Sequence, residues 1–160
     1  MMIGVAVVLI SSKILSGQDP DENRKSLERI LTNHQLTLLS YEVVADDRQA
    51  ISRQLATLCE MNAPHIIFTL GGTGVRPTDW APEATRDVIE KEIPGIGEAM
   101  RAESLKKVRT AMLSRGTAGI KGTTLIMNLP GSVKGVQENL EVVLPLLEHM
   151  VGKMGSMATP

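Results

Sequence analysis

The 160-residue chain has very few aromatic side chains, with one Trp, one Tyr and one Phe. Proteins that bind single-stranded nucleic acids by stacking need several exposed rings, so the composition excludes this class. An excess of charge is also missing, because 17 Lys and Arg residues are balanced by 18 Asp and Glu residues. A general nucleic-acid binder needs surplus cations to displace the counterions of the phosphates. We therefore expect no nucleic acid among the partners of this protein.

Cysteine and long hydrophobic runs are scarce as well. Cys59 is the only cysteine in the sequence, so it cannot form an internal disulfide. A lone cysteine favours a reducing compartment. The apolar segment 1–10 is too short to cross a bilayer and has no basic region before it, so it predicts a buried first strand rather than a signal peptide. We expect a cytoplasmic protein that does not contact membranes.

The chain alternates between short apolar runs and amphipathic segments. The runs are rich in Val, Ile and Leu, as expected of strands buried on both faces, and cover Ile3–Ile10, Leu36–Val44, His65–Leu70 and Thr123–Leu129. The amphipathic segments have helical spacing and cover Glu22–Leu36, Arg48–Met61, Pro82–Ile93 and Val133–Met150. This alternation predicts an α/β fold with a mostly parallel central sheet covered by helices on both sides. The length predicts one domain, expected over 1–151, followed by a flexible tail over 152–160.

The segments that follow the predicted strands are small, polar or acidic. They are Ser11-Ser12-Lys13 after the first strand, Asp46 after the second, Gly71–Gly74 and then Asp79 after the third, and Pro130-Gly131-Ser132 after the fourth. In sheets of this kind, ligands bind beyond the carboxyl ends of the strands. We therefore expect all four segments to meet at one edge of the sheet and to form the site.

Two of these segments have features that suit an anion. Thr69–Gly74 reads TLGGTG, and its glycines permit positive φ and a close approach of backbone N–H groups to a phosphate. The segment lacks the Walker A pattern and the GxGxxG pattern, and an ordinary tight turn stays an alternative. After Pro130–Ser132 a helix begins, and its N-terminus would also suit a phosphate while Ser132 caps it.

Two acids complete the predicted site. Asp46 and Asp79 follow neighbouring strands in this prediction, where two carboxylates can share a Mg²⁺ ion carried on substrate phosphates. Asp79 alone could instead cap the helix that begins near Pro82. The pair Ser114-Arg115 precedes a glycine-spaced segment that is either a plain hairpin or a flap over the site. In a flap, the Arg115 guanidinium would suit an anionic ligand.

The order of the motifs resembles the molybdopterin-binding family of molybdenum-cofactor biosynthesis, which includes MogA and MoaB proteins. The resemblance covers about residues 3 to 150 and rests on GGTG, an Asp after four intervening residues, Pro-Glu-Ala, IPGIGEAMR, SR, AGIKG and TLIMNLPGS. It implies a three-layer α/β/α molybdopterin-binding fold. It also implies a molybdopterin adenylyltransferase, which transfers AMP from Mg-ATP to molybdopterin and releases pyrophosphate.

The resemblance implies roles for individual residues. Asp46 and Asp79 match the two catalytic aspartates and would position Mg²⁺ and the ATP phosphates. The residues that match the ligand-binding positions are Ser11, Ser12, Gly71, Gly72, Thr73, Gly74, Ser114, Arg115, Pro130, Gly131 and Ser132. The family also implies a trimer or a hexamer, and a molybdenum insertase of the MoeA type as a partner.

The chain departs from the family pattern in three places. Ser12-Lys13 replaces the Asp-Arg that MogA-like members often have after the first strand, which leaves a MoaB-like carrier that binds molybdopterin without catalysis as an alternative. Asp21 and Asn23 are similar to the D-x-N loop of CinA-type domains, so a related nucleotide-handling domain is a third alternative. Trp80 stands where many relatives have a smaller residue, and it would either flank the pterin or pack the loop.

Overall fold

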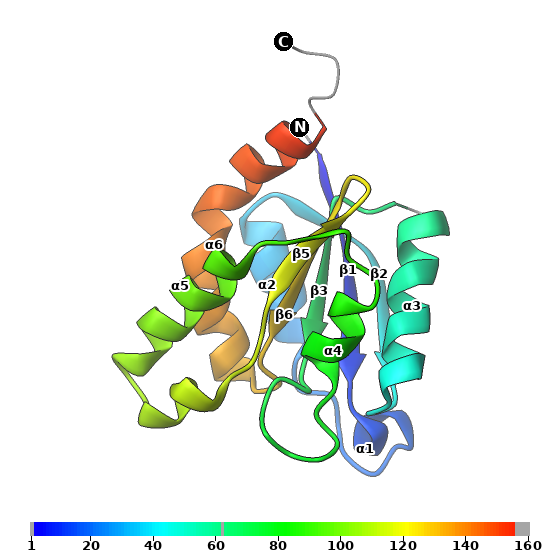
Figure 1. The fold of residues 1–160 in the computed structure, drawn as a ribbon, viewed down its shortest axis with the longest axis vertical. Helices are drawn as coiled ribbons and strands as arrows, with labels where there is room; N and C mark the ends of the chain where they lie inside the picture. Colours follow the sequence, from blue (N-terminus) through cyan, green and yellow to red (C-terminus); the bar gives the residue numbers. More distant parts are fainter. Residues whose placement is uncertain (1, 62, 156–160) are drawn as a thin grey trace.

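The computed structural model describes residues 2–61 and 63–155. In chain order the elements are β1 (Ile3–Ile10), α1 (Ser12–Leu15), α2 (Arg24–Asn33), β2 (Leu36–Val44), α3 (Arg48–Met61), β3 (Ile66–Leu70), α4 (Ala81–Arg86), β4 (Lys91–Glu92), α5 (Pro94–Leu105), the 3₁₀ helix η1 (Arg109–Leu113), β5 (Ala118–Lys121), β6 (Thr124–Leu129) and α6 (Val133–Met154). They are shown in Figure 1. Helix α6 extends past the predicted end at Met150 and into the predicted tail. The last part of that tail, 156–160, lies outside the described residues.

The strands form one six-stranded sheet in the order β2-β1-β3-β6-β5-β4. Strands β2, β1, β3 and β6 are parallel, whereas β5 runs antiparallel to both β6 and β4. This confirms the mostly parallel sheet. The strand order reverses between β1 and β3, and a crevice at the carboxyl ends is expected at such a reversal. In Figure 1 these ends point downward, toward α1 and the loop between β3 and α4.

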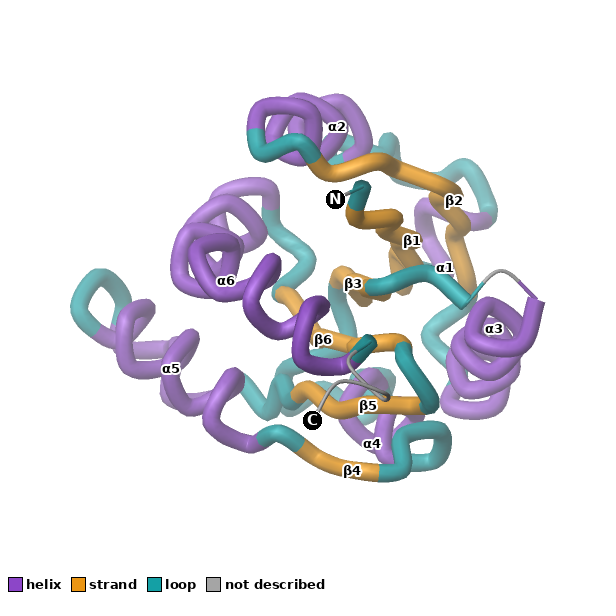
Figure 2. The backbone as a smooth tube through the Cα atoms, turned by 90° about the horizontal axis from the view of Figure 1, so that it is seen from above, coloured by secondary structure: helices purple, strands orange, loops and turns teal. Residues whose placement is uncertain are grey.

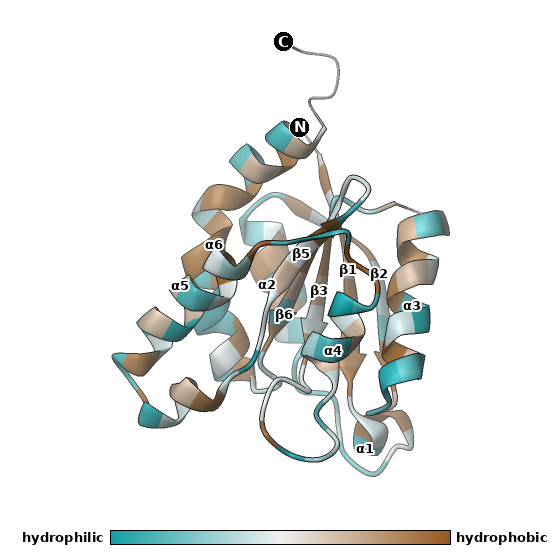
Figure 3. Ribbon diagram, viewed as in Figure 1, coloured by the Kyte–Doolittle hydropathy of each residue, from teal (hydrophilic) through white to brown (hydrophobic). Residues whose placement is uncertain are grey.

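Helices cover both faces of the sheet, as Figure 2 shows: α2, α5 and α6 lie on one side, and α3 and α4 on the other. The strand β1 serves both layers, since Val5 and Val7 pack with the first group of helices and Ala6 and Val8 with the second. Because neither face of this strand contacts solvent, its side chains are apolar at successive positions, which explains the continuous apolar run. Figure 3 shows the hydrophobic strands enclosed by helices with hydrophilic outer faces. The predicted three-layer α/β/α architecture is confirmed.

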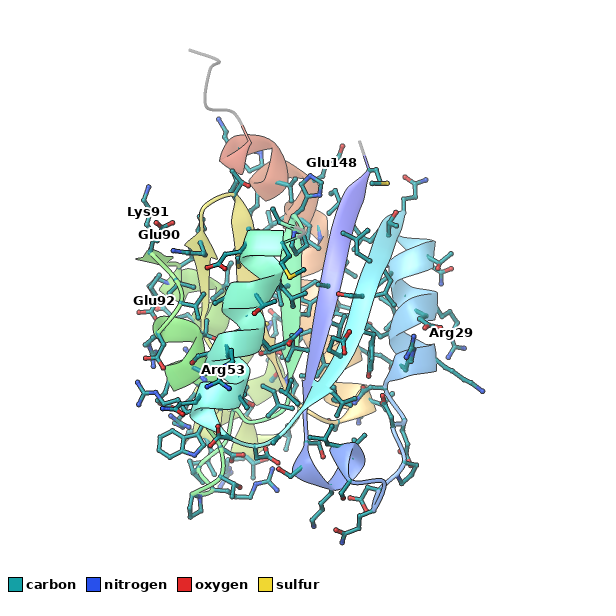
Figure 4. All side chains as sticks on the ribbon, turned by 90° about the vertical axis from the view of Figure 1, so that its right-hand side faces the viewer. Arg29, Arg53, Glu90, Lys91, Glu92 and Glu148 are labelled. Carbon is teal, nitrogen blue, oxygen red and sulfur yellow. The ribbon has the colours of Figure 1, made fainter. Side chains whose placement is uncertain are left out.

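Charged side chains occupy the outer faces of the helical layers. Figure 4 shows Arg29 on α2 and Arg53 on α3, and both are exposed to solvent. In the described part of the chain, no helix is both long enough and apolar enough to cross a membrane.

The predicted helix Pro82–Ile93 is wrong in its second half, because α4 ends at Arg86. The following residues pair with the edge of the sheet: the Glu90 N–H donates to the Ile120 carbonyl at 2.8 Å, and the Ile93 N–H donates to the Ala118 carbonyl at 2.7 Å. Local periodicity does not report a pairing with a strand some 30 residues further along the chain. The tertiary contact therefore overrides the helical pattern.

Helix α5 was not predicted from periodicity. Gly95 and Gly97 lie in its first turn, and glycine lowers helix propensity by about 1 kcal/mol. The structure explains Gly97, because a Cβ atom there would lie 2.5 Å from the Gly116 carbonyl oxygen. The glycine thus lets the segment around Gly116 pass directly over the helix.

The glycine-spaced segment after Arg115 is a plain hairpin. Strands β5 and β6 pair antiparallel around a turn at Gly122, which has a φ of +61°. Because Ala118 and Gly119 are buried in the central sheet, this segment is not a flap over the site.

Candidate functional site

The loops after β1 and β2 are joined by a reciprocal pair of hydrogen bonds. The Ser12 N–H donates to Asp46 Oδ2 at 2.9 Å, and the Asp46 N–H donates to Ser12 Oγ at 2.9 Å. Ser11 lies beside them, where its Oγ caps α1 by accepting from the Ile14 N–H at 3.2 Å. The predicted residues Ser11, Ser12 and Asp46 therefore form one cluster at the ends of β1 and β2.

The glycine loop after β3 lies against the backbones of both neighbouring strand ends. Gly71 and Gly72 have φ values of +96° and +70°, which favour glycine. A Cβ atom on Gly71 would lie 2.8 Å from the Ile10 carbonyl oxygen, and one on Gly131 would lie 3.4 Å from the Gly71 Cα. The loops that follow β1, β3 and β6 thus meet through their backbones, as predicted.

The Asp79 carboxylate is buried beneath the glycine loop, with 4% of the residue exposed. Its Oδ2 accepts hydrogen bonds from the Arg76 backbone N–H at 2.9 Å and from Arg76 Nε at 3.4 Å. A Cβ atom on Gly74 would lie 2.9 Å from this same oxygen. The N-cap residue of α4 is Trp80, so Asp79 does not cap that helix.

The two acids do not follow neighbouring strands, and that part of the prediction is wrong. Asp46 follows β2 and Asp79 follows β3, with β1 between them. Asp79 lies well beyond the end of β3 at Leu70, in the loop that leads to α4. The strand order by itself therefore does not bring the two carboxylates together at one ion.

Arg115 binds the protein itself rather than an open anion site. Its Nε donates to the Gly74 carbonyl at 2.7 Å, its Nη2 donates to the Asp79 carbonyl at 2.9 Å, and its Nη1 pairs with Glu83. Its backbone N–H also donates to the Thr73 carbonyl at 2.8 Å. Burial by itself would raise the pKa of the Glu83 carboxyl, but the hydrogen bond from Arg115, a backbone hydrogen bond and the charges of Arg115 and Arg86 together lower the pKa below its ordinary value. The guanidinium thus fastens both ends of the loop that presents Asp79.

A buried polar network, which sequence reasoning missed, supports the same loops. Asn128 Nδ2 donates to the hydroxyl oxygens of Thr69 and Thr85 at 2.9 Å each, and its Oδ1 accepts from the Thr117 N–H at 3.1 Å. Thr69 precedes the glycine loop and Thr117 follows the Ser-Arg pair. Asn128 therefore links β3, α4 and the segment that follows Arg115.

A pocket of about 440 Å³ opens between the glycine loop, the 3₁₀ helix η1 and the first turns of α6. Six predicted site residues line it: Thr73, Gly74, Asp79, Ser114, Pro130 and Ser132. The other predicted residues lie outside its lining, namely Ser11, Ser12, Asp46, Gly71, Gly72, Arg115 and Gly131. The lining also includes polar residues that sequence reasoning missed, namely Arg76, Arg101, Ser104, Thr110, Glu138 and Asn139. Arg76 follows the glycine loop and Arg101 ends the motif IPGIGEAMR. The other four residues come from segments with no glycine-rich or acidic motif to mark them.

The N-terminus of α6 forms one wall of the pocket. Ser132 is its N-cap, with Oγ accepting from the Gly135 N–H at 3.1 Å, as predicted. Arg101 on α5 lies at the pocket as well, and its Nη1 donates to the Gly116 carbonyl at 2.7 Å. A helix N-terminus together with guanidinium groups favours bound anions. Trp80 is 37% exposed and lies outside the pocket lining.

The donors available to a divalent cation are the two acids. Carboxylate oxygens suit Mg²⁺, and among the hydrogen bonds of the described residues the Asp46 and Asp79 carboxylates accept only through Oδ2, which leaves each Oδ1 for a ligand. Within residues 2–61 and 63–155, no group of three or more His, Cys, Asp and Glu side chains could hold a metal by itself. The residues fit an ion that takes most of its ligands from substrate phosphates and water, which is the usual habit of Mg²⁺.

Comparison with known proteins adds an independent line of support. The family model described as "Probable molybdopterin binding domain" matches residues 6–149. The chain is 40% identical over 151 residues to a molybdopterin adenylyltransferase of Helicobacter pylori strain J99, covering 93% of this chain and 86% of the relative. It is 41% identical over 143 residues to the molybdopterin adenylyltransferase of Escherichia coli K12, covering 87% and 72%.

Solved structures agree with the sequence relatives. The molybdopterin biosynthesis enzyme MoaB from Thermus thermophilus superimposes with a TM-score of 0.90 at 39% identity, covering 96% of both chains. The glycine loop, the two acids and the turn at the start of α6 thus occur in a chain whose whole fold matches these proteins. The chain belongs to the molybdopterin-binding domain family of molybdenum-cofactor biosynthesis.

Proposed function

We propose that this protein is a molybdopterin adenylyltransferase, which transfers AMP from Mg-ATP to molybdopterin and releases pyrophosphate. The observation that carries the proposal is the meeting of the buried Asp79 carboxylate with the glycine loop and the N-terminus of α6 at one pocket. Acids beside anion-binding backbone turns suit a reaction between two phosphate compounds and a cation. The relatives named as adenylyltransferases, at about 40% identity, support the same reaction.

The proposed chemistry needs positioning and charge stabilisation rather than a protein nucleophile. An oxygen of the terminal phosphate of molybdopterin attacks the α-phosphorus of ATP, and the bond to the pyrophosphate leaving group breaks. We assign the glycine loop and the start of α6 to holding the molybdopterin phosphate, and the Ser12–Asp46 cluster to the nucleotide side. Bound Mg²⁺ would supply positive charge to the phosphoryl oxygens between Asp46 and Asp79.

The test is incubation of the full chain with molybdopterin and Mg-ATP, followed by detection of adenylylated pterin and pyrophosphate. We expect pyrophosphate release only when molybdopterin is present. Asp46→Asn and Asp79→Asn should each lower kcat by about a hundredfold or more, because metal-bound charge contributes several kcal/mol to such transition states.

The matched control is Asp47→Asn. Asp47 is adjacent to Asp46, but its Oδ2 accepts from the Ala50 N–H at 2.9 Å at the start of α3. Asparagine caps a helix as well as aspartate does, so this variant should keep wild-type activity. Full activity in both the Asp46 and Asp79 variants would refute the catalytic assignment. Pterin binding without pyrophosphate release would favour the MoaB-like carrier instead.

We further propose a homo-oligomer, a trimer or a hexamer, in the cytoplasm, with an insertase of the MoeA type receiving the product. Apolar side chains at the end of α5 and on η1 support self-association: Leu105 and Met112 lie outside the pocket lining and are 41% and 63% exposed. Large exposed apolar patches are uncommon on monomers. Light scattering on the purified protein would test the proposal, and a monomeric mass at micromolar concentration would refute it.

A further inference from the structure

The pocket contains a carboxylate that the proposed reaction does not yet use. Glu138 lies on α6 and lines the pocket, and its side chain is only 18% exposed. None of the hydrogen bonds among the described residues involves this carboxylate. Its closest cations are Lys107 at 3.7 Å and Lys134 at 3.9 Å, both on flexible and largely exposed side chains. Its carboxylate oxygens are not enclosed by the protein, so they are accessible to a ligand in the pocket.

The position of Glu138 places it away from the phosphate-binding end of the pocket. Ser132 is the N-cap of α6, Gly135 and Glu138 lie three residues apart on the helix, and all three line the pocket. Six residues of helix put Glu138 about 9 Å along α6 from Ser132. Ser104 and Glu138 also line a second groove between α5 and α6, so they mark the end of the pocket that faces away from the glycine loop.

The surroundings of Glu138 suit a flat ring that carries hydrogen-bond donors. Val108 and Leu113 line the same pocket with exposed apolar side chains. Asn139, next to Glu138, is buried, and its Nδ2 donates to the Gly135 carbonyl at 2.7 Å. Apolar walls with a few convergent polar groups are typical of a site for a small cyclic ligand.

The two substrates of the proposed reaction differ in the edge that they would present to a carboxylate. A pterin carries a 2-amino-4-oxopyrimidine ring, whose ring N–H and exocyclic amino group donate side by side. A carboxylate accepts both donors with its two oxygens. Adenine presents an amino group beside a ring nitrogen that is an acceptor, so it satisfies one carboxylate oxygen and repels the other. The geometry therefore favours the pterin at this end of the pocket.

We propose that Glu138 binds the aminopyrimidinone edge of the pterin substrate and determines its selection over adenine. This inference rests on the proposed function, and it assigns the pterin ring and its phosphate to opposite ends of the pocket. The pterin ring lies between η1 and α6, and its phosphate reaches the glycine loop and the start of α6. ATP then enters from the Ser12–Asp46 side, which lies outside the pocket lining.

The test compares Glu138→Gln with Glu141→Gln in the full chain. Glu141 lies one turn further along α6 and lines only the adjoining groove, so it is the matched control. We expect Glu138→Gln to raise KM for molybdopterin about tenfold or more, because one acceptor becomes a donor and the charge is lost. KM for ATP and kcat should stay close to wild type. Glu138→Asp should recover part of the affinity, since it keeps both acceptor oxygens.

A binding measurement separates this inference from the proposed function. Titration with 6-hydroxymethylpterin, followed by the fluorescence of the pterin, needs no turnover and is carried out in parallel with adenosine. We expect the wild type to bind the pterin more tightly than adenosine, and Glu138→Gln to lose this preference. Unchanged pterin affinity in Glu138→Gln, an equal loss in Glu141→Gln, or a selective rise in KM for ATP would each overturn the inference. Absence of adenylylated product from the wild type, with pterin binding intact, would count against the proposed function alone.

Discussion

Replacing Arg115 tests whether hydrogen bonds from its guanidinium stabilise the loop that contains Asp79. The guanidinium donates to two loop carbonyls, those of Gly74 at 2.7 Å and Asp79 at 2.9 Å, and it pairs with Glu83. Hydrogen bonds from charged donors contribute about 1.5–3 kcal/mol each. The Arg115 side chain is 37% exposed, so we reduce this to roughly 1 kcal/mol for each of the three contacts. Arg115→Ala should therefore lower the free energy of unfolding by about 3 kcal/mol.

The assay is thermal unfolding followed by circular dichroism, together with the adenylylation rate. For a chain of this length, 3 kcal/mol corresponds to a fall in Tm of about 6–12 °C. Arg115→Lys keeps the charge but not the planar set of donors, so it should recover less than half of the loss. At temperatures where Arg115→Ala is still folded, the rate should fall as well, because the Asp79 loop is no longer fastened.

The control for this prediction is Arg48→Ala. Arg48 makes two hydrogen bonds of 2.8 Å to Asp87, but this pair is exposed and does not contact the Asp79 loop. Exposed ion pairs contribute little to stability, so its Tm should change much less. Equal Tm losses in Arg48→Ala and Arg115→Ala would refute the proposed stabilisation of the Asp79 loop by Arg115. A wild-type adenylylation rate in folded Arg115→Ala would refute it as well.

Three further predictions concern the same loops. Gly74→Ala places a Cβ atom 2.9 Å from the Asp79 carboxylate oxygen, so we expect a large loss of adenylylation with near-native circular dichroism; retained activity would contradict this contact. Asn128→Ala leaves two buried hydroxyl groups and one N–H without their partner, and it should lower stability in urea unfolding by about 2–4 kcal/mol, whereas a change below about 1 kcal/mol would contradict the network. Because the pKa of Glu83 is lower in the folded state than its ordinary value of 4.5, its pairing with Arg115 stabilises the fold above that pH and the contribution is lost as the pH falls through the folded-state pKa. Glu83→Gln should therefore weaken the acid dependence of Tm below about pH 4.5, and an unchanged dependence would exclude Glu83 as its source.

Most of the fold could be predicted because burial leaves a pattern in local sequence. The runs at β1, β3 and β6 are apolar throughout since helices cover both of their faces. One exception is β2, an edge strand in which only Leu36 is fully buried, although a strand buried on both faces was predicted. The other is the region 87–113, where the prediction extended a helix through β4 and missed α5. There the chain pairs briefly with β5, and Gly97 lies close to the Gly116 carbonyl. Neither contact produces a periodic pattern in the local sequence.

The candidate site was predicted as a set of loops but not as a pocket. The glycine loop, Asp79 and Ser132 carry signals in the sequence, because glycines with positive φ and helix caps have characteristic residue types. Glu138 and Asn139 carry no such signal, since they are ordinary residues of an amphipathic helix until α5 and α6 face each other across the pocket.

The sequence by itself therefore determined the layered architecture, the family and the edge of the sheet where the candidate site is expected. These follow from residue periodicity and from motifs whose order along the chain is preserved. Only the tertiary structure decided that β1 separates Asp46 from Asp79, and that Arg115 binds the loop instead of an open anion site. Strand order and hydrogen-bond partners depend on contacts between residues far apart in the chain. Local pattern constrains which face of an element is buried, but not which distant group lies against it.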